Sequence, residues 1–237
     1  MSDFEIGSEN QLLAALSVSV YERLLTHGEE ICLKSGQIVH KSYEPVTQVY
    51  FPITAVFSSV IQMADGSSCE VALIGKEGLV GLPAVFGSIS IATNSIVQIS
   101  GTAIELSAQA IQKEFQKGGE LQRLLLQYTQ AYIAYISHIA ACNSLHSVEQ
   151  RFARFLLLVS NCIGCETLPL TQKLISSLLG VRRASITETA ISLQSRSIIQ
   201  YSRGKIEIVD RSGLKAIACE CYSKIESDYL TFIQQKL

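Results

Sequence analysis

The sequence of 237 residues predicts an α+β fold with an N-terminal antiparallel β-roll, a long helix and a C-terminal winged helix-turn-helix. Short runs rich in Val, Ile, Phe and Tyr follow one another from residue 30 to 106. A heptad stripe then covers residues 121–142, and a helix-turn-helix pattern with a hairpin begins at residue 170. The expected parts are residues 1–117 for the N-terminal helix and roll, 118–145 for the dimerisation helix, and 146–237 for the winged helix-turn-helix with a C-terminal helix.

The composition predicts a folded chain in the cytoplasm. Apolar residues make up 48% and charged residues 17% of the chain, against about 25% charged in typical domains. The acidic start, MSDFEIGSEN, has no basic residues before an apolar run, so we expect no secretory signal. Two uncharged stretches, 78–104 and 124–148, contain Gly and Pro or several polar side chains, and this disfavours a membrane span.

Charge divides the chain into two unlike parts. Residues 1–147 carry 7 basic and 13 acidic side chains, whereas residues 148–237 carry 12 basic and 8 acidic ones. The net charge of −2 hides this difference, and it excludes a polycation that binds nucleic acid by bulk charge. We therefore expect the two parts to contact different partners.

The N-terminal part is predicted to be one helix followed by strands. Apolar residues at helical spacing over residues 8–28, opened by Ser8 and Asn10, predict a short amphipathic helix. The strand-like runs are ICL, QIVH, QVYF, AVFSSVIQM, CEVALIG, SIVQIS and AIELS. Asp65 and Gly66 predict a two-residue type I′ hairpin, because Gly tolerates the positive φ of that turn. Strands at this spacing close into an antiparallel roll or barrel.

A helix around residues 108–119 precedes the long helix, which is predicted to reach about Asn143. The apolar stripe of the long helix advances by four and three residues in turn, which is the a/d pattern of a coiled coil. Its members are Leu121, Leu125, Tyr128, Tyr132, Tyr135, Ile139 and Cys142. We expect this stripe to pair with a second copy across a two-fold axis. The alternative is that it packs on the chain's own roll, since a heptad pattern does not say which chain supplies the partner.

The last third of the sequence predicts a winged helix-turn-helix. Ser147 opens a helix with the pattern of a capping box. Further on, helices over residues 172–179 and 182–195 are joined by a tight turn at Gly180. Two strand-like runs, SIIQYS and KIEIVD, then form the hairpin. Residues 212–235 predict one more amphipathic helix.

The second helix of the pair is predicted to enter the major groove of DNA. A helix N-terminus rich in Arg and hydroxyl groups can bond to base edges and phosphates. Between residues 170 and 205 the acid Glu188 stands against six basic side chains. The preceding helix N-terminus can bind a phosphate, and the hairpin cations can reach the flanking backbone. The expected DNA-binding residues are Thr171, Gln172, Arg182, Arg183, Ser185, Ile186, Thr187, Arg203 and Lys205.

Residues 148–214, with LTQKLISSLLGVRRASITETAISLQSRSIIQYSRGKIEIVD at their centre, resemble the DNA-binding domain of the Crp/Fnr family of bacterial transcription regulators. The order of a cyclic-nucleotide-binding-like roll, a long helix and a winged helix is similar to that family from about residue 10 to 237. The resemblance implies a homodimer on double-stranded DNA, at a pseudo-palindromic site with half-sites about one helical turn apart. It implies a regulator and not an enzyme, with RNA polymerase as a partner if the protein is an activator.

The recognition helix departs from the family pattern of Arg-Glu-Thr-Val with a further Arg. Arg183, Ser185 and Ile186 fit that pattern. Ala184 replaces the Glu, and Glu188 stands where the later Arg would be. We therefore do not expect the half-site sequence of the best-known members.

The roll lacks the cassette with which family members bind cyclic nucleotides, Gly-Glu-Leu followed by Arg-Thr-Ala or Arg-Ser-Ala. The corresponding stretch, VGLPAVFGSISIATNSIVQ at 80–98, has Leu82 or Pro83 in place of the acid and contains no Arg. A buried cyclic phosphate would lack its counter-charge there. We expect an effector other than cyclic AMP or GMP, and we predict no cofactor.

Four C-terminal thiols suggest an alternative regulator that responds to thiol oxidation or to a metal. Cys162 and Cys165 lie in a loop before the winged helix, and Cys219 and Cys221 lie on the predicted last helix. Two positions two apart on a helix face different sides, which is poor for chelation. Structural, reduced thiols are therefore the expectation.

Three further alternatives stay open. A thiol oxidoreductase using Cys162 and Cys165 would need a βαβ context and a lowered thiol pKa. A cupin-like metal enzyme would need more ligands than His40, which is the histidine of the roll. The third is a protein that keeps the regulator fold but has lost DNA binding.

Overall fold

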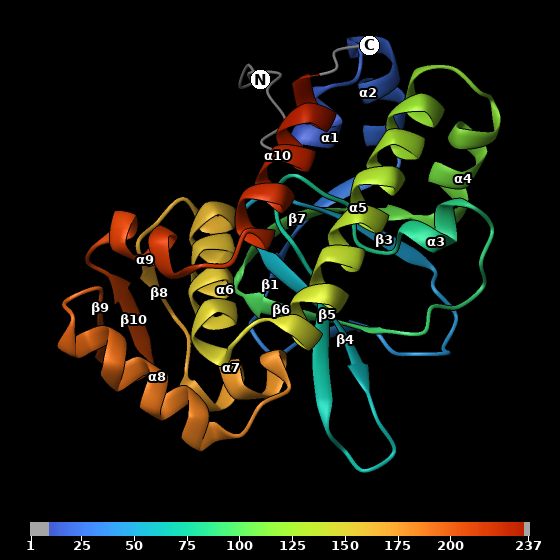
Figure 1. Cartoon of the computed structure of the whole chain (residues 1–237). Helices are drawn as coiled ribbons and strands as arrows, with labels where there is room; N and C mark the ends of the chain where they lie inside the picture. Colours follow the sequence, from blue (N-terminus) through green and yellow to red (C-terminus); the bar gives the residue numbers. More distant parts are fainter. Residues whose placement is uncertain (1–9, 235–237) are drawn as a thin grey trace.

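The computed structural model describes residues 10–234, with side chains described to residue 228. Its element order is the predicted one: N-terminal helices, a roll of strands, a long helix and a winged helix (Figure 1). Ser8 and Gln235, at the two ends of predicted helices, lie outside the described residues. Within residues 10–234, none of the helices combines the length and the hydropathy that crossing a bilayer requires.

The helix predicted over residues 8–28 is two helices. They are α1 (Gln11–Ala14) and α2 (Val18–Leu25). Between them the backbone is extended at Ser17, whose N–H and hydroxyl donate to the carboxylate of Glu120 at 2.8 and 2.6 Å. This contact joins the segment between α1 and α2 to the start of the long helix. A local apolar pattern does not predict it.

Seven strands in two antiparallel sheets form the predicted roll. The sheet orders are β1-β7-β3 and β2-β6-β4-β5. The strands are β1 (Gly28–Leu33), β2 (Ile38–His40), β3 (Gln48–Pro52), β4 (Val56–Gln62), β5 (Ser68–Ile74), β6 (Asn94–Ile99) and β7 (Gly101–Ser107). Apolar side chains from both sheets, including Tyr50, Phe57 and Val97, fill the space between them. The short helix α3 (Leu82–Val85) and α4 (Ala108–Gln116) contact each other.

Strands β4 and β5 form the predicted hairpin, but its turn is of another type. The Met63 N–H donates to the Ser67 carbonyl at 2.8 Å, so three residues form the loop. Gly66 has a φ of +84°, whereas Asp65 is not among the described residues with positive φ. A type I′ turn needs positive φ at both central residues, so the predicted turn type is wrong. The Asp65 carboxylate instead accepts bonds from the N–H and hydroxyl of Ser67.

The apolar stripe predicted for dimerisation lies on α5 (Glu120–Leu145) and is buried within its own chain. Tyr132 is half-buried, and the other members, which are at most 4% exposed, are Leu121, Leu125, Tyr128, Tyr135, Ile139 and Cys142. The hydroxyls of Tyr128 and Tyr135 accept bonds from the N–H groups of Leu79 and Leu73, at 3.1 and 3.2 Å. The structure thus corrects the prediction that these side chains face a second copy. They pack against other parts of the same chain, chiefly the roll, because a sheet face satisfies a heptad stripe as well as a helix does.

A second stripe of α5 faces outward and repeats with the same steps of three and four residues. We name it the outer stripe, and it consists of Arg123, Leu126, Gln130, Ile133, Ser137, Ala140 and Ser144, all exposed. Leu126 is 51% and Ile133 60% exposed, so the outer stripe presents two large apolar side chains to solvent. The sequence analysis missed this stripe, because polar members interrupt its apolar period.

Helix α6 (Val148–Ile163) stands between the roll and the winged helix (Figure 1). It begins with the predicted capping box of Ser147 and Gln150, and residues 151–160 are all buried. The winged helix consists of β8 (Thr167–Leu168), α7 (Gln172–Leu179), α8 (Arg183–Ser195), β9 (Ile199–Ser202) and β10 (Lys205–Ile208). One apolar core runs from β4, β5 and α5 through α6 into this domain.

The last predicted helix is also two helices, α9 (Arg211–Ile217) and α10 (Cys221–Gln234). The extended backbone of Ala218, with φ −58° and ψ 146°, ends α9. Helix α10 then runs back along α5 (Figure 1). Cys219 lies in the connection, so it does not share a helix with Cys221 as predicted.

Candidate nucleic-acid interface

The turn between α7 and α8 has the geometry that the sequence predicts. The Thr171 hydroxyl accepts a bond from the Leu174 N–H at 3.1 Å and caps α7. Gly180 ends α7 with a φ of +61°, in the left-handed region that a side chain disfavours. The two helices are held together by Ile175, Leu178, Leu179, Ile186 and Ala190, each at most 3% exposed.

The predicted contact residues differ in how much of them solvent can reach. The exposed ones are Thr171, Arg182, Arg183, Arg203 and Lys205. Gln172, Ser185 and Thr187 are partly exposed. Four of these five exposed side chains are cations, so the surface that they form is strongly positive.

Ile186 is a correction to the predicted contact set. It is 0% exposed and belongs to the core that joins α7 to α8. A side chain enclosed in this way cannot reach a base edge. Its agreement with the Crp/Fnr pattern therefore reflects packing and not DNA contact.

Thr187 and Gln172 connect the first turns of the two helices. The Thr187 hydroxyl lies 2.9 Å from Oε1 of Gln172 and 3.1 Å from the carbonyl oxygen of Arg183, and it can donate to either. This contact fixes α8 relative to the N-terminus of α7, where a phosphate would bind.

The hairpin lies beside the N-terminus of α7. Gly204 forms its turn with a φ of +74°, and a Cβ built there would lie 3.8 Å from Cγ2 of Thr171. Arg203 and Lys205 flank that glycine and are exposed. The hairpin cations and the start of α7 therefore belong to one continuous surface.

Three exposed residues of α8 were not among the predicted contacts. Ala184, Glu188 and Ile191 follow one another at four and three residues, so they share one face of the helix. Ile191, the last of the three, is 63% exposed. Their spacing is visible in the sequence. Ala184 and Ile191 carry no charge, so an expectation based on cations did not include them.

The tip of the roll touches the turn of the helix-turn-helix. The hydroxyls of Ser68 and Ser177 lie 2.7 Å apart, and Gly180 lies against Cys69 of β5. The roll therefore contacts the winged helix directly at α7, in addition to the core that runs through α6.

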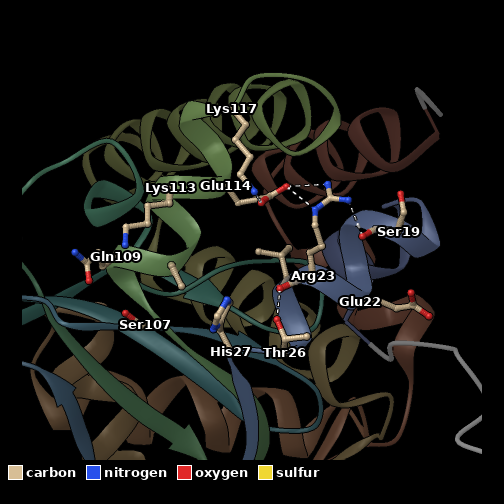
Figure 2. Close-up of a pocket in the computed structure, with 12 residues that line it drawn as sticks. Ser19, Glu22, Arg23, Thr26, His27, Ser107, Gln109, Lys113, Glu114 and Lys117 are labelled. Atoms are coloured by element: carbon tan, nitrogen blue, oxygen red, sulfur yellow. Dashed lines mark hydrogen bonds and ion pairs between the residues drawn. The ribbon is translucent and has the colours of Figure 1, made fainter.

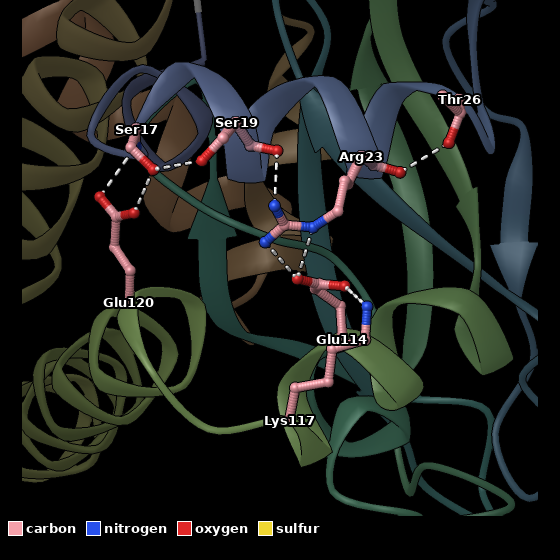
Figure 3. A network of polar contacts seen from close by, with 7 residues as sticks. All are labelled: Ser17, Ser19, Arg23, Thr26, Glu114, Lys117 and Glu120. Atoms are coloured by element: carbon pink, nitrogen blue, oxygen red, sulfur yellow. Dashed lines mark hydrogen bonds and ion pairs between the residues drawn. The ribbon is translucent and has the colours of Figure 1, made fainter.

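The roll also carries a surface pocket of about 710 Å³ between α2 and α4 (Figure 2). Arg23 and Lys117 both bind the Glu114 carboxylate, at 2.9 and 2.5 Å (Figure 3). The Lys117 ammonium, followed by the Arg23 guanidinium, holds the pKa of Glu114 below its usual value. These two cations are paired with Glu114, whereas Lys113, which also lines the pocket, forms no ion pair with another described residue.

The thiols of Cys162 and Cys165 have separate surroundings. Burial raises the pKa of Cys162, which is the opposite of what a reactive thiolate needs. Cys165 is exposed, and its sulfur accepts a bond from the Thr167 N–H at 3.4 Å. Neither joins the group that Cys219 and Cys221 form with other side chains of the described part of the chain.

One protein-family model matches the part of the chain that forms this surface. Residues 150–217 match the model of the Crp-like helix-turn-helix domain. The match covers α6, the helix-turn-helix, the hairpin and α9, which are the elements described above. No curated protein matches the chain in sequence.

Solved structures show the same fold over most of the chain. A transcriptional regulator of the Crp/Fnr family from Eubacterium rectale has 18% identity and a TM-score of 0.70, with 87% of this chain and 96% of that chain covered. FixK2 from Bradyrhizobium japonicum has 16% identity and a TM-score of 0.70, with 81% and 98% covered. The c-di-GMP responsive regulator CLP from Xanthomonas campestris has 17% identity and a TM-score of 0.66, with 81% and 99% covered.

Proposed function

We propose that this chain, which has a Crp-like helix-turn-helix domain on the fold of the Crp/Fnr regulators, is a transcription regulator that binds specific DNA sequences as a homodimer. One observation carries the proposal above all: the start of α8 exposes Arg182 and Arg183, and the hairpin exposes Arg203 and Lys205. A protruding helix fits the shape of the major groove, and cations at its N-terminus and along its border are attracted to the DNA.

The exposed residues divide into those that position the protein and those that read bases. Arg203 and Lys205 on the hairpin, with Thr171 at the start of α7, suit contacts to phosphates. Arg183 suits a bidentate bond to guanine. Glu188 can accept a bond from cytosine, and Ile191 can contact a thymine methyl group. This set differs from the family pattern, so we expect a distinct half-site.

The outer stripe of α5 is the surface that we assign to the homodimer. Its exposed apolar residues, Leu126 and Ile133, lie one heptad apart, and the smaller Ala140 follows at the next. A repeat of this kind pairs with its own copy across a two-fold axis. Two α8 helices would then face half-sites of one pseudo-palindrome.

The effector that we propose is not cyclic AMP or GMP. Leu82, at the place of the acid in the cyclic-nucleotide cassette, is 5% exposed and packs in an apolar cluster. The adjoining roll interior is lined by apolar side chains such as Phe57 and Val97. A cyclic phosphate would find no cation there to replace its hydration. The location in the cytoplasm and, for an activator, a contact with RNA polymerase follow from the proposed role.

Selection of bound sequences from a random DNA pool tests this proposal. We expect a two-fold symmetric motif from the purified protein. Arg183→Ala should weaken binding to that motif by about 5- to 150-fold, because one good base contact contributes about 1–3 kcal/mol. Arg196→Ala is the matched control, since Arg196 is at the far end of α8 and pairs with Glu149 at 3.0 Å.

Two results would contradict the proposal. One is that no motif is enriched at low salt, where phosphate contacts are strongest. The other is that Arg183→Ala and Arg196→Ala bind the selected motif equally well.

A further inference from the structure

Three buried thiols and one imidazole meet where α5 ends. The ligand atoms of Cys142, His146, Cys219 and Cys221 all lie within 4.8 Å of one another. The sulfurs of Cys142 and Cys219 are 3.4 Å apart, and the Cys221 sulfur lies 3.7 Å from Nδ1 of His146. We name these four residues the cysteine-histidine cluster. Neither the DNA-binding surface nor the outer stripe uses them.

The local backbone explains how four residues from two distant segments converge. Cys142 and His146 are four residues apart at the end of α5, so their side chains share one face. The extended residue Ala218 separates Cys219 from the helix that precedes it, and Cys221 opens α10. This break removes the objection that two cysteines two apart on one helix face different sides.

The spacing of these atoms suits a single tetrahedral ion. A zinc ion with bonds of about 2.3 Å to sulfur places neighbouring sulfurs about 3.7 Å apart. The sulfurs of Cys142 and Cys219, at 3.4 Å, are close to that value, and all four ligand atoms lie within 4.8 Å of one another. Three sulfur ligands and one nitrogen are a set that structural zinc sites use and that hard cations such as Mg²⁺ do not.

His146 is held in the orientation that a ligand needs. Its Nδ1 faces the thiols, while its Nε2 lies 3.2 Å from a carboxylate oxygen of Glu220. A carboxylate on the far nitrogen of a ligating histidine fixes the ring and its tautomer. Glu220 lies between Cys219 and Cys221 in the sequence, so residues 219–221 supply two ligands and the group that orients a third.

The surroundings are dry and positively charged. Cys142, Cys219 and Cys221 are at most 3% exposed and form an apolar cluster of their own. Arg151 and Arg154 of α6 are buried, and the Nε of each has no hydrogen-bond partner among the described residues. Both guanidinium groups act electrostatically on Cys142. Zn²⁺ with three thiolates and a neutral imidazole has a charge of −1, which such cations would balance.

We propose that the cysteine-histidine cluster is a zinc site, with Cys142, His146, Cys219 and Cys221 as its four ligands. On binding, the thiols release their protons to solvent and bind as thiolates, while His146 binds through Nδ1 as the neutral imidazole. No electron is transferred, so the site needs no oxidant or reductant. The closed set of four protein ligands makes it structural and not catalytic.

The position of this site gives it a consequence for the domain arrangement. Helix α5 ends at Leu145, and α6 begins at Val148, so the cluster lies at the junction between the long helix and the DNA-binding domain. An ion there ties α5 to the connection between α9 and α10. If the proposed function holds, the occupied site fixes the two α8 helices relative to the dimer axis, and its removal weakens binding to the selected DNA.

Metal analysis of the full chain, purified anaerobically with reduced thiols, tests the site without reference to DNA. After removal of metal with a chelator and addition of zinc, we expect one zinc ion per chain. Co²⁺ as a probe should show the visible absorption of a tetrahedral thiolate complex. Cys219→Ser and His146→Asn should lose the ion or bind it far more weakly. Glu220→Gln should lower the affinity by about 10- to 100-fold, since it removes the group that orients a ligand.

Cys162→Ser and Cys165→Ser are the matched controls, because these thiols lie outside the cluster. Both should keep one zinc ion per chain. His146→Asn alters a partly exposed side chain, and circular dichroism of its metal-free form checks that it folds. The proposal is overturned if the reduced wild type binds no zinc, or if the controls lose the ion as readily as Cys219→Ser. Loss of DNA binding with zinc retained would count against the proposed function alone.

Discussion

The two faces of α5 carry the same heptad spacing and do different things. The face with Tyr128 and Tyr135 lies against the roll and is almost inaccessible to solvent. The outer stripe, with Leu126 and Ile133, is open. A heptad period therefore identified a packed seam correctly but assigned it to the wrong partner, since a roll of strands and a second helix both bury such a seam.

The two faces should also contribute to two different free energies, that of folding and that of association between chains. Side chains on the buried face stabilise one chain, so their loss should change the free energy of unfolding at any protein concentration. Side chains on the outer stripe should act through association, so their effect should depend on concentration. The following four substitutions test this distinction, from the largest expected effect to the smallest.

Leu125→Ala should lower the free energy of unfolding by about 3–5 kcal/mol, because Leu125 is 0% exposed and leaves a cavity. Urea denaturation at two protein concentrations measures it. The neighbouring substitution Leu126→Ala is the control on the outer stripe, and under dilute conditions it should change stability by no more than about 0.5 kcal/mol. Equal losses for the two variants in dilute solution would break the distinction between the faces.

Glu70→Gln tests the polar contact beneath the buried face. Burial raises the pKa of Glu70 from 4.5 to about 7, opposed by the Ser58 hydroxyl and by the charge of Arg154. The folded state therefore holds this proton more tightly than the unfolded state, so the stability linked to it is full below pH 4.5 and is lost as the pH rises through 7. The variant should match the wild type at pH 4 and exceed it by about 3 kcal/mol at pH 8.

Denaturation of both proteins across this pH range measures the difference. A constant difference between pH 4 and pH 8 would mean that the pKa of Glu70 is the same in the folded and unfolded states, so that burial does not raise it. Glu105→Gln, on a half-buried side chain of β7, is the control for a carboxylate elsewhere on the roll.

Ile133→Glu should break the proposed dimer without unfolding the chain. A charge placed in the paired seam should raise the dissociation constant at least tenfold, equal to about 1.4 kcal/mol. Analytical ultracentrifugation measures it. Ser137→Ala on the same stripe is the control, and we expect little change in the dissociation constant. Ser147→Glu does not serve as a control, because it alters a helix cap. An unchanged dimer in Ile133→Glu would move the interface away from the outer stripe.

His138→Gln should have the smallest effect, below about 1 kcal/mol. His138 lies between the two faces and pairs with Asp228 of α10 at 3.7 Å, with both side chains partly exposed. Thermal denaturation at neutral pH measures it. A loss above 2 kcal/mol would show that His138 contributes more to the packing of α10 on α5 than this one contact accounts for.

Local rules identified most of the elements because the relevant forces act over a few residues. The capping box at Ser147, the left-handed Gly180 and the alternating strands of the roll all follow from hydrogen bonds and φ preferences within one turn. The same holds for the cations of the helix-turn-helix, since their exposure follows from the apolar positions beside them. Ile186 is the exception, because it fits the family pattern of the recognition helix but is buried in the core.

Contacts between distant segments decided the rest. The bond from Ser17 to Glu120 crosses 103 residues and divides the first helix. The cluster joins Cys142 to Cys219 across 77 residues, and no spacing rule for metal ligands covers that distance. Residues 162 and 165 have the more familiar spacing, yet they do not converge with Cys219 and Cys221.

The sequence by itself determined the order of the elements, the helix-turn-helix with its exposed cations, and the opposite charges of the two halves. These depend on short-range periodicity and on composition, which a chain carries whatever its partners are. Only the tertiary structure decided which stripe of α5 is open, that Ile186 is enclosed, and that a broken C-terminal helix brings Cys219 and Cys221 to Cys142 and His146. Those outcomes depend on which surfaces bury one another, and burial is settled only when the whole chain packs.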